Sequence, residues 1–215
     1  MEPPEVKPKI ILASNSPRRR YLLKRAGLRF AVIPSRIREG EPGGAPPERF
    51  VRELAIAKAR DVAGSHPESW VIGADTVVVV DGTVLGKPPS IEEARRMLTR
   101  LSGRTHEVLT GFCIYRRLDE RLFADTVRTA VQFKELAPAE IEWYIRTGEP
   151  FDKAGAYAIQ GIGTFLVRRI EGSYTNVVGL PVCEVIEILI REGVVGYERP
   201  QPAPLEAAAE KDASS

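Results

Sequence analysis

Short β-branched runs alternate along the chain with longer stretches in which apolar side chains recur at helical spacing. The clearest helical pattern covers 48–63. The longest strand is predicted over 70–80, where one acidic residue interrupts an otherwise apolar run. A turn at Asp81-Gly82 then leads into a short strand over 83–85.

The remaining pattern completes an alternation of strands and helices. Further strands are predicted over 9–13, 30–33, 106–116, 123–133 and 165–170. Further helices are predicted over 17–26, 90–101, 138–147 and 181–193. Two long strands in succession indicate antiparallel pairing, so we expect an α/β fold with a mixed twisted sheet flanked by helices. We also expect two lobes with a central cleft.

Composition limits the compartment and the domain count. Residues 1–8 and 200–215 are rich in proline, alanine and charge and are predicted to be disordered tails around a single domain at 9–199. The sequence shows no secretory signal and no apolar run long enough to span a bilayer, so we expect a cytoplasmic protein with no membrane partner. Cys113 and Cys183 both lie in apolar runs, which predicts buried, reduced thiols.

The overall charge argues against one class of partner. The chain has 215 residues, with 31 Lys and Arg against 29 Asp and Glu, a formal net charge of +2. Proteins that bind the phosphate backbone of nucleic acids generally carry a larger basic excess, so no nucleic-acid partner is expected. A small anionic ligand needs only a local cationic cluster and remains compatible with this balance.

The segment from Ser14 to Arg20 is the first candidate for ligand chemistry. It follows a predicted strand and opens a predicted helix, and it contains three consecutive arginines. Cations are electrostatically unfavourable at a helix start, which suggests that an anion binds there. Backbone N–H groups at such a terminus and bidentate arginines favour phosphate. The alternative is a solvated basic helix face.

Charged residues elsewhere supply further candidates. Asp75 lies within an apolar strand, where a carboxylate must be paired, bind a cation or act as a base; the alternative is a bulge or turn. Lys87 stands between Gly86 and Pro88 and can present its ammonium to phosphate, or it is a solvated turn residue. Lys58 falls on the apolar helix face, where the alternative is a side chain that extends to the surface. Together these residues suit metal-assisted hydrolysis of a phosphoanhydride.

The sequence resembles the Maf family over about residues 9–193. Six segments agree with that family in order and spacing. They are Ser14-x-Ser16-Pro17-Arg18-Arg19, Gly73-Ala74-Asp75-Thr76, Gly86-Lys87-Pro88, Leu101-Ser102-Gly103-x-Thr105-His106, Asp152-Lys153-Ala154-Gly155-Ala156-Tyr157-x-Ile159-Gln160-Gly161 and Val178-Gly179-Leu180-Pro181. The resemblance implies a fold similar to inosine triphosphate pyrophosphatases, a homodimer, and a requirement for a divalent cation such as Mg²⁺, Mn²⁺ or Co²⁺.

The resemblance also implies roles for individual residues. Asp75 matches the proton acceptor of a nucleoside triphosphate pyrophosphatase, and Glu39 with Asp75 would hold the metal. The family often has two adjacent acids where this chain has Arg38-Glu39, which weakens the case for metal ligation there. The remaining implied contacts are to the triphosphate or the base. They involve Ser14, Arg18, Arg19, Lys58, Thr76, Lys87, Lys153 and Gln160.

The sequence leaves two questions of function open. The Ile-Gln-Gly sequence around Gln160 resembles the branch that acts on dTTP and UTP, whereas the branch that acts on 7-methyl-GTP has Glu there. A nucleic-acid-binding regulator of cell division and a nucleotide sensor without turnover are the rival interpretations. The low net charge counts against the first, and intact Asp75, Glu39 and Lys87 count against the second. Removal of modified nucleotides and control of septation would look identical in this sequence.

Overall fold

A seven-stranded mixed sheet forms the centre of the computed structural model, which describes residues 9–38, 40 and 43–196. The strands follow the order β2-β1-β3-β5-β6-β7, and β4 pairs with β3 outside this path. Strand β1 is parallel to β2 and β3, and the other pairs are antiparallel. The strands are β1 (Ile10–Leu12), β2 (Ala31–Val32), β3 (Trp70–Val80), β4 (Thr83–Leu85), β5 (Thr105–Arg116), β6 (Arg121–Phe133) and β7 (Val167–Glu171).

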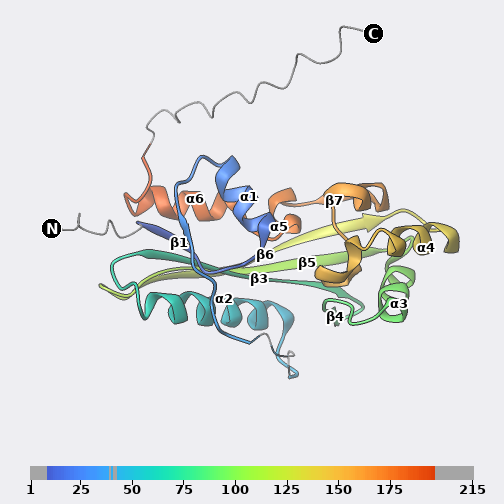
Figure 1. Cartoon of the computed structure of the whole chain (residues 1–215), viewed down its shortest axis with the longest axis horizontal. Coiled ribbons are helices and arrows are strands. Elements are labelled where there is room, and N and C mark those ends of the chain that lie inside the picture. The colour runs from blue at the N-terminus through green and yellow to red at the C-terminus, as the bar shows by residue number, and fades with distance from the viewer. Residues whose placement is uncertain (1–8, 39, 41–42, 197–215) are drawn as a thin grey trace, which may run out of the picture.

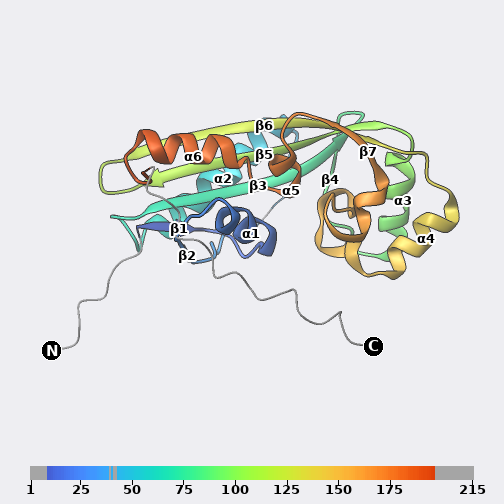
Figure 2. The same cartoon turned by 90° about the horizontal axis from the view of Figure 1, so that it is seen from above.

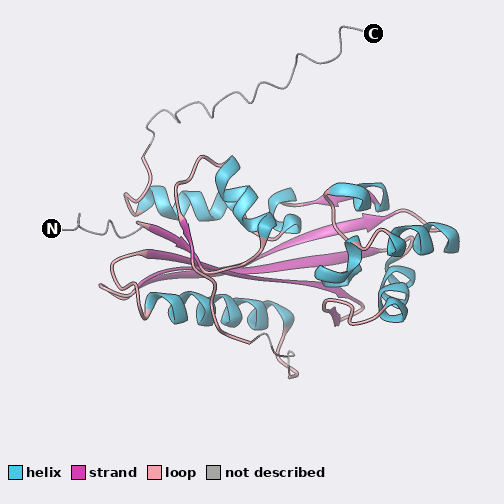
Figure 3. Cartoon of the chain, in the orientation of Figure 1, coloured by secondary structure: helices cyan, strands magenta, loops and turns pink. Residues whose placement is uncertain are grey.

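Helices cover both faces of this sheet. Figure 1 shows α2 along one face and α1, α5 and α6 along the other, and Figure 3 shows the same layers by type of element. Seen from above, α3 and α4 gather at one end of the long strands (Figure 2). The helices are α1 (Pro17–Arg25), α2 (Pro47–Ala63), α3 (Ile91–Leu101), α4 (Pro138–Arg146), α5 (Tyr174–Val178) and α6 (Val182–Arg191), with 3-10 helices η1 (Glu149–Asp152), η2 (Ala154–Ala156) and η3 (Gly161–Leu166).

Helix α2 packs unusually close to the sheet because two strand positions lack a side chain. A Cβ atom at Gly73 of β3 would lie 2.2 Å from the carbonyl oxygen of Ala55. One at Gly111 of β5 would lie 2.3 Å from the carbonyl of Val51. Both distances are shorter than any van der Waals contact, so only glycine permits this approach.

The apolar core divides along the length of the strands. At one end of the sheet, α3 and α4 pack on Val78, Val108 and Phe133. At the other end, one face holds the side chains under α1 and α6, including Ile72 and Ile114, and the opposite face holds those under α2. Strands β3, β5 and β6 run through both ends, which agrees with the two lobes predicted on one sheet.

Most predicted elements are confirmed, with differences at a few positions. The strand predicted over 165–170 begins only at Val167, because Phe165 belongs to η3. Helix α5 and the 3-10 helices were not predicted. The tails predicted at 1–8 and 200–215, and the domain boundary at 199, lie outside the described residues.

The cysteine prediction is half right. Cys113 is buried in β5, whereas Cys183 is exposed, so the prediction of a buried thiol at Cys183 is wrong. Successive helical residues turn by about 100°, which places Cys183 on the far side of α6 from the buried Val185 and Leu189. Among the described residues, no helix is both long and apolar enough to cross a bilayer.

Candidate active site

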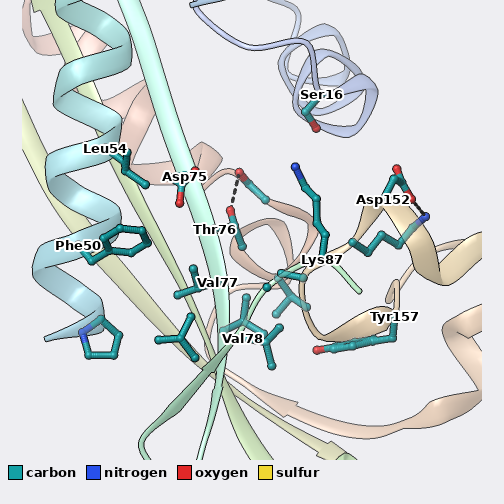
Figure 4. A pocket seen from close by; sticks show the side chains of 18 of the residues that line it. Ser16, Phe50, Leu54, Asp75, Thr76, Val77, Val78, Lys87, Asp152 and Tyr157 are labelled. Atoms are coloured by element: carbon teal, nitrogen blue, oxygen red, sulfur yellow. Dashed lines mark hydrogen bonds and ion pairs between the residues drawn. The ribbon is translucent and has the colours of Figure 1, made fainter. Parts of the chain in front are cut away.

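A cleft of about 1440 Å³ opens between the start of α1, the middle of β3 and the segment that carries η1 to η3. Figure 4 shows how side chains from these distant parts of the sequence face one space. Lys58 lies behind the wall of the cleft, in contact with a lining residue, and Glu39 is outside the described residues. The other predicted residues all line it: Ser14, Arg18, Arg19, Asp75, Thr76, Lys87, Lys153 and Gln160.

Asp75 and Lys58 form a buried ion pair at the wall of the cleft. The Nζ of Lys58 lies 2.7 Å from Oδ1 of Asp75, and the two side chains are only 7% and 9% exposed. Asp75 pairs in regular register with Gly111, so it is neither in a bulge nor in a turn. Lys58 does not extend to the surface, because the close packing of α2 on β3 brings it directly to the carboxylate.

Arg19 joins three segments beneath the cleft. Its Nε donates to the carbonyl of Gly179 at 2.7 Å, and its Nη1 donates to Ser14 Oγ at 3.1 Å and to the carbonyl of Ala74 at 2.9 Å. Its Nη2 donates to Thr76 Oγ1 at 3.0 Å. These bonds tie the start of α1 to β3 and to the residue after α5. Arg19 therefore organises the site, and its predicted contact with a triphosphate stays a prediction.

The start of α1 is built as the sequence indicated. Pro17 occupies the first turn, and the side chain of Ser16 caps the helix by accepting from the N–H of Arg19. Ser14 Oγ accepts from the N–H of Ser16 at 3.2 Å. No acidic residue lies in the first turn. The positive end of the helix dipole therefore lies beside Arg18, and no carboxylate in the first turn of α1 offsets it.

Arg18 reaches across the mouth of the cleft to the 3-10 segment. Its Nη1 lies 3.0 Å from Oδ2 of Asp152, and Lys153 also contacts that carboxylate while its Nζ donates to the carbonyl of Glu149 at 2.6 Å. Partial burial acts to raise the pKa of Asp152, but hydrogen bonds from Lys153 and Arg18 outweigh it and hold that pKa below its ordinary value. Two predicted substrate contacts thus share one acidic partner.

Lys87 follows the β4 strand on a turn that rests on the 3-10 segment. The N–H of Gly155 donates to the carbonyl of Gly86 at 3.0 Å. Gly155 has a φ of +69°, and a Cβ there would lie 2.9 Å from the side chain of Val78. Figure 4 shows Lys87 extending from this turn into the pocket, toward Ser16. This placement supports the predicted exposure of its ammonium to an anionic ligand.

A buried polar network behind Thr76 was not predicted. Thr76 Oγ1 lies 2.9 Å from Thr110 Oγ1, which donates to the carbonyl of Asn176 at 3.1 Å. The Nδ2 of Asn176 donates to Val108 and to Thr129 Oγ1 at 3.1 and 3.0 Å. These residues fix Thr76 and the short helix α5 relative to β5 and β6. The available signal was the presence of Thr76 and Thr110 inside the largely apolar strands β3 and β5.

Carboxylates in the cleft suit a hard divalent cation, although the described residues form no closed metal cage. Among the described residues, no group of three or more His, Cys, Asp and Glu side chains could hold a metal ion. Within the part of the chain that the structure describes, the carboxylates lining the cleft are those of Asp75, Asp152 and Glu93. Mg²⁺ commonly binds through one or two carboxylates together with the phosphates of its substrate, so Asp75 fits this mode.

Comparison with known proteins agrees with the arrangement of the site. The family described as Maf-like protein matches residues 9–192. A dTTP/UTP pyrophosphatase of Geotalea uraniireducens is 52% identical over 191 residues, which cover 89% of this chain and 98% of the relative. Proteins of that name from Moorella thermoacetica and Myxococcus xanthus are 53% and 51% identical, over 86% of this chain and 96% and 93% of their own lengths. The chain therefore belongs to the Maf family.

Proposed function

We propose that this protein is a nucleoside triphosphate pyrophosphatase that hydrolyses dTTP and UTP to the monophosphate and pyrophosphate. The observation that carries the proposal is the buried pair of Asp75 and Lys58 at the wall of a cleft that Arg18 and Lys87 also line. A fixed carboxylate beside several cations is what attack of water on a phosphoanhydride needs. The names of relatives more than 50% identical to this chain support the same reaction.

In this mechanism Asp75 acts as the general base. Lys58 engages Oδ1, which leaves Oδ2 as the oxygen that takes the proton from the attacking water. The water oxygen bonds to the α-phosphorus, and the bond from that phosphorus to the bridging oxygen breaks. Pyrophosphate leaves with the electron pair. Lys58 holds the carboxylate in one orientation, so the base is positioned before the substrate arrives.

Cationic groups of the cleft would stabilise the leaving pyrophosphate. Lys87 enters from the turn after β4, and Arg18 and the N–H groups of the first turn of α1 lie on the opposite side. Negative charge grows on the bridging oxygen and the departing phosphates during cleavage, and fixed positive groups lower the energy of that state. Lys153 and Ser14 are further groups that can contact phosphate oxygens.

We propose that a divalent cation, Mg²⁺, Mn²⁺ or Co²⁺, is required. Asp75 and Glu39 would hold it together with phosphate oxygens of the substrate. When bound, such an ion neutralises phosphate charge and polarises the reacting phosphoryl group. The protein supplies the oxygen ligands and the orientation of the triphosphate.

Gln160 is proposed to read the base. It is half-buried in the cleft, between Ile159 and Gly161. A carboxamide can donate to O4 of uracil or thymine and accept from N3–H, whereas a carboxylate would suit the N1–H and N2–H₂ donors of guanine. A mismatched buried polar pair costs about 1–3 kcal/mol. Gln160→Glu should therefore lower kcat/KM for UTP relative to GTP by about 5- to 150-fold. An equal loss for all nucleotides would instead indicate a bracing role for Gln160.

The reaction is tested by identifying its products. Purified protein is incubated with UTP and Mg²⁺, Mn²⁺ or Co²⁺, and the products are separated by ion-exchange chromatography. We expect UMP and pyrophosphate, and no activity after chelation of the metal. UDP and phosphate would overturn the proposed bond cleavage.

We further propose that the enzyme is a homodimer and that it is cytoplasmic. Sedimentation of the purified protein tests the oligomeric state, and cell fractionation tests the location.

A further inference from the structure

We propose that Glu149 and Tyr144 are positioning residues that hold the segment 158–163 in the shape that lets Gln160 discriminate between bases. The inference deepens the proposed function and depends on it. Neither side chain lines the cleft among the described residues, and neither belongs to the predicted chemistry. Both instead face the back of the segment whose front carries Ala158, Ile159 and Gln160.

The carboxylate of Glu149 accepts hydrogen bonds from three donors, two of which belong to the segment. Its Oε1 accepts from the hydroxyl of Tyr144 at 2.8 Å and from the N–H of Gly163 at 2.9 Å. Its Oε2 accepts from the N–H of Ile162 at 3.0 Å. Two consecutive backbone amides are thus fixed by one side chain located at the start of η1. Hydrogen bonds to an ionised acceptor are stronger than neutral ones.

Tyr144 holds the other end of the same segment. It is fully buried on α4, and its hydroxyl accepts from the N–H of Ala158 at 3.1 Å while it donates to Glu149. Burial and the neighbouring carboxylate raise the pKa of Tyr144 far above its ordinary value. The hydroxyl therefore stays protonated and keeps its role as donor. Ala158 and Gly163, on either side of Gln160, are both fixed to one pair of side chains.

Two glycines show how closely the segment lies on this pair. A Cβ at Gly161 would lie 2.7 Å from Oε2 of Glu149, and Gly161 has a φ of +71°. A Cβ at Gly163 would lie 2.5 Å from the hydroxyl oxygen of Tyr144. Thr164 constrains the same segment further, because its hydroxyl donates to the carbonyls of Ile159 and Gly161 at 3.1 and 2.7 Å. The path of the backbone around Gln160 is therefore set from behind.

Discrimination by a hydrogen bond requires that the reading group cannot move to suit another base. A segment with two free ends would let the Gln160 amide shift by an ångström or rotate, and the mismatched base would then find partners. The scaffold of Glu149 and Tyr144 removes that freedom. Its loss should weaken selection between bases and leave the triphosphate contacts from α1, β3 and the turn after β4 largely intact.

The test uses two variants with matched controls. Glu149→Gln places an amide donor against one of the N–H groups now bonded to the carboxylate, and Tyr144→Phe deletes one oxygen that bonds to both Glu149 and Ala158. Glu171→Gln removes an exposed carboxylate on β7, and Tyr115→Phe removes a hydroxyl at the far end of β5 from His106. kcat/KM is measured for UTP, dTTP and GTP, together with inhibition by inorganic tripolyphosphate, which has no base.

We expect each scaffold variant to lower the UTP to GTP preference about 10-fold through a higher KM for UTP. The Ki of tripolyphosphate should stay within about twofold of the wild type, and the controls should behave as wild type. Equal losses for all nucleotides, or a parallel loss of tripolyphosphate binding, would overturn the inference. If Glu149→Gln does not fold, Tyr144→Phe decides the question alone, and if it too fails to fold, the residues are structural and the inference is wrong. Failure of the wild type to form UMP from UTP would refute the proposed function itself.

Discussion

At the scale of single residues, the site depends on charges that could not be assigned to partners from sequence. Asp75 and Lys58 were each singled out because a charge in an apolar pattern needs a reason. The sequence offered an ion pair, metal binding, base catalysis, a turn or a surface-reaching side chain, without naming a partner for either residue, and the structure shows a direct ion pair between them. The pair depends on tertiary packing between residues 17 positions apart, and no local pattern encodes that packing.

Replacement of Asp75 should separate catalysis from folding. Asp75→Asn removes the basicity of the side chain, so we expect kcat with UTP to fall by about 10²- to 10⁴-fold. The buried ammonium of Lys58 also loses the negative charge of Asp75, which should lower the free energy of unfolding by about 3–5 kcal/mol. Steady-state kinetics and urea denaturation measure the two effects. Asp125→Asn, on the exposed side of β6, is the control, and near-normal turnover of Asp75→Asn would exclude this residue as the base.

Burial of His106 makes a testable contribution to acid sensitivity. It bonds to the hydroxyl of Tyr157 at 2.8 Å, and burial lowers its pKa to about 4, against about 6.5 in an unfolded chain. Between these values the unfolded state binds more protons, so stability is present above pH 6.5 and is lost as pH falls toward 4. The full contribution is about 3 kcal/mol. In urea titrations from pH 7 to 4, His106→Gln should lose less stability than wild type or the control His66→Gln. Parallel curves would contradict this account.

At the scale of elements, the sequence pattern predicted helices and strands correctly where the hydrophobic periodicity extends over many residues. The strand over 70–80 and the helix over 48–63 contain many repeats, and the structure confirms both to within a residue or so. Helix α5 and the 3-10 helices are too short to show a period, and their shape follows from side chains that meet them from elsewhere. The motifs contained most of the polar residues that line the cleft, but not its apolar residues such as Phe50 and Leu54. They did not reveal how Glu149 and Tyr144 hold one of its walls, because those contacts join different elements.

Close packing of α2 on β3 should be sensitive to a single methyl group. Gly73→Ala would place a Cβ against the backbone of Ala55 and force the helix outward. Over-packing of this kind costs about 1–3 kcal/mol, and it also separates Lys58 from Asp75, so kcat should fall with the melting temperature. Gly196→Ala, where a Cβ meets nothing within 4 Å, is the control. Calorimetry and a UTP assay on both variants test the prediction, and equal melting temperatures would show that the helix can adapt at no cost.

At the scale of the whole molecule, a chain of nearly balanced charge brings several cations from distant segments to one cleft. The formal net charge is only +2, yet Arg18, Lys87 and Lys153 all line the cleft between the two ends of the sheet. They come from α1, from the turn after β4 and from the end of η1, and the shared sheet brings these segments together. Cationic groups placed in this way can contact an anionic ligand although the chain as a whole has no large basic excess.

Asp152 contacts two of these cations, Arg18 and Lys153, and it should compete with the substrate for them. Its ion pair with Arg18 is partly exposed, with side chains 27% and 61% accessible, so the pair adds at most about 1 kcal/mol to stability. Asp152→Asn keeps the size of the side chain, removes a negative charge that repels the triphosphate and releases Arg18 and Lys153. We therefore expect KM for UTP to fall about 2- to 5-fold at low salt, with an unchanged melting temperature. The difference from wild type should shrink at high ionic strength, where charge interactions are screened.

Steady-state kinetics at two salt concentrations, with Asp125→Asn as the control, measure both effects. A higher KM for Asp152→Asn would mean that Asp152 holds the two cations in place for the substrate instead of competing with it.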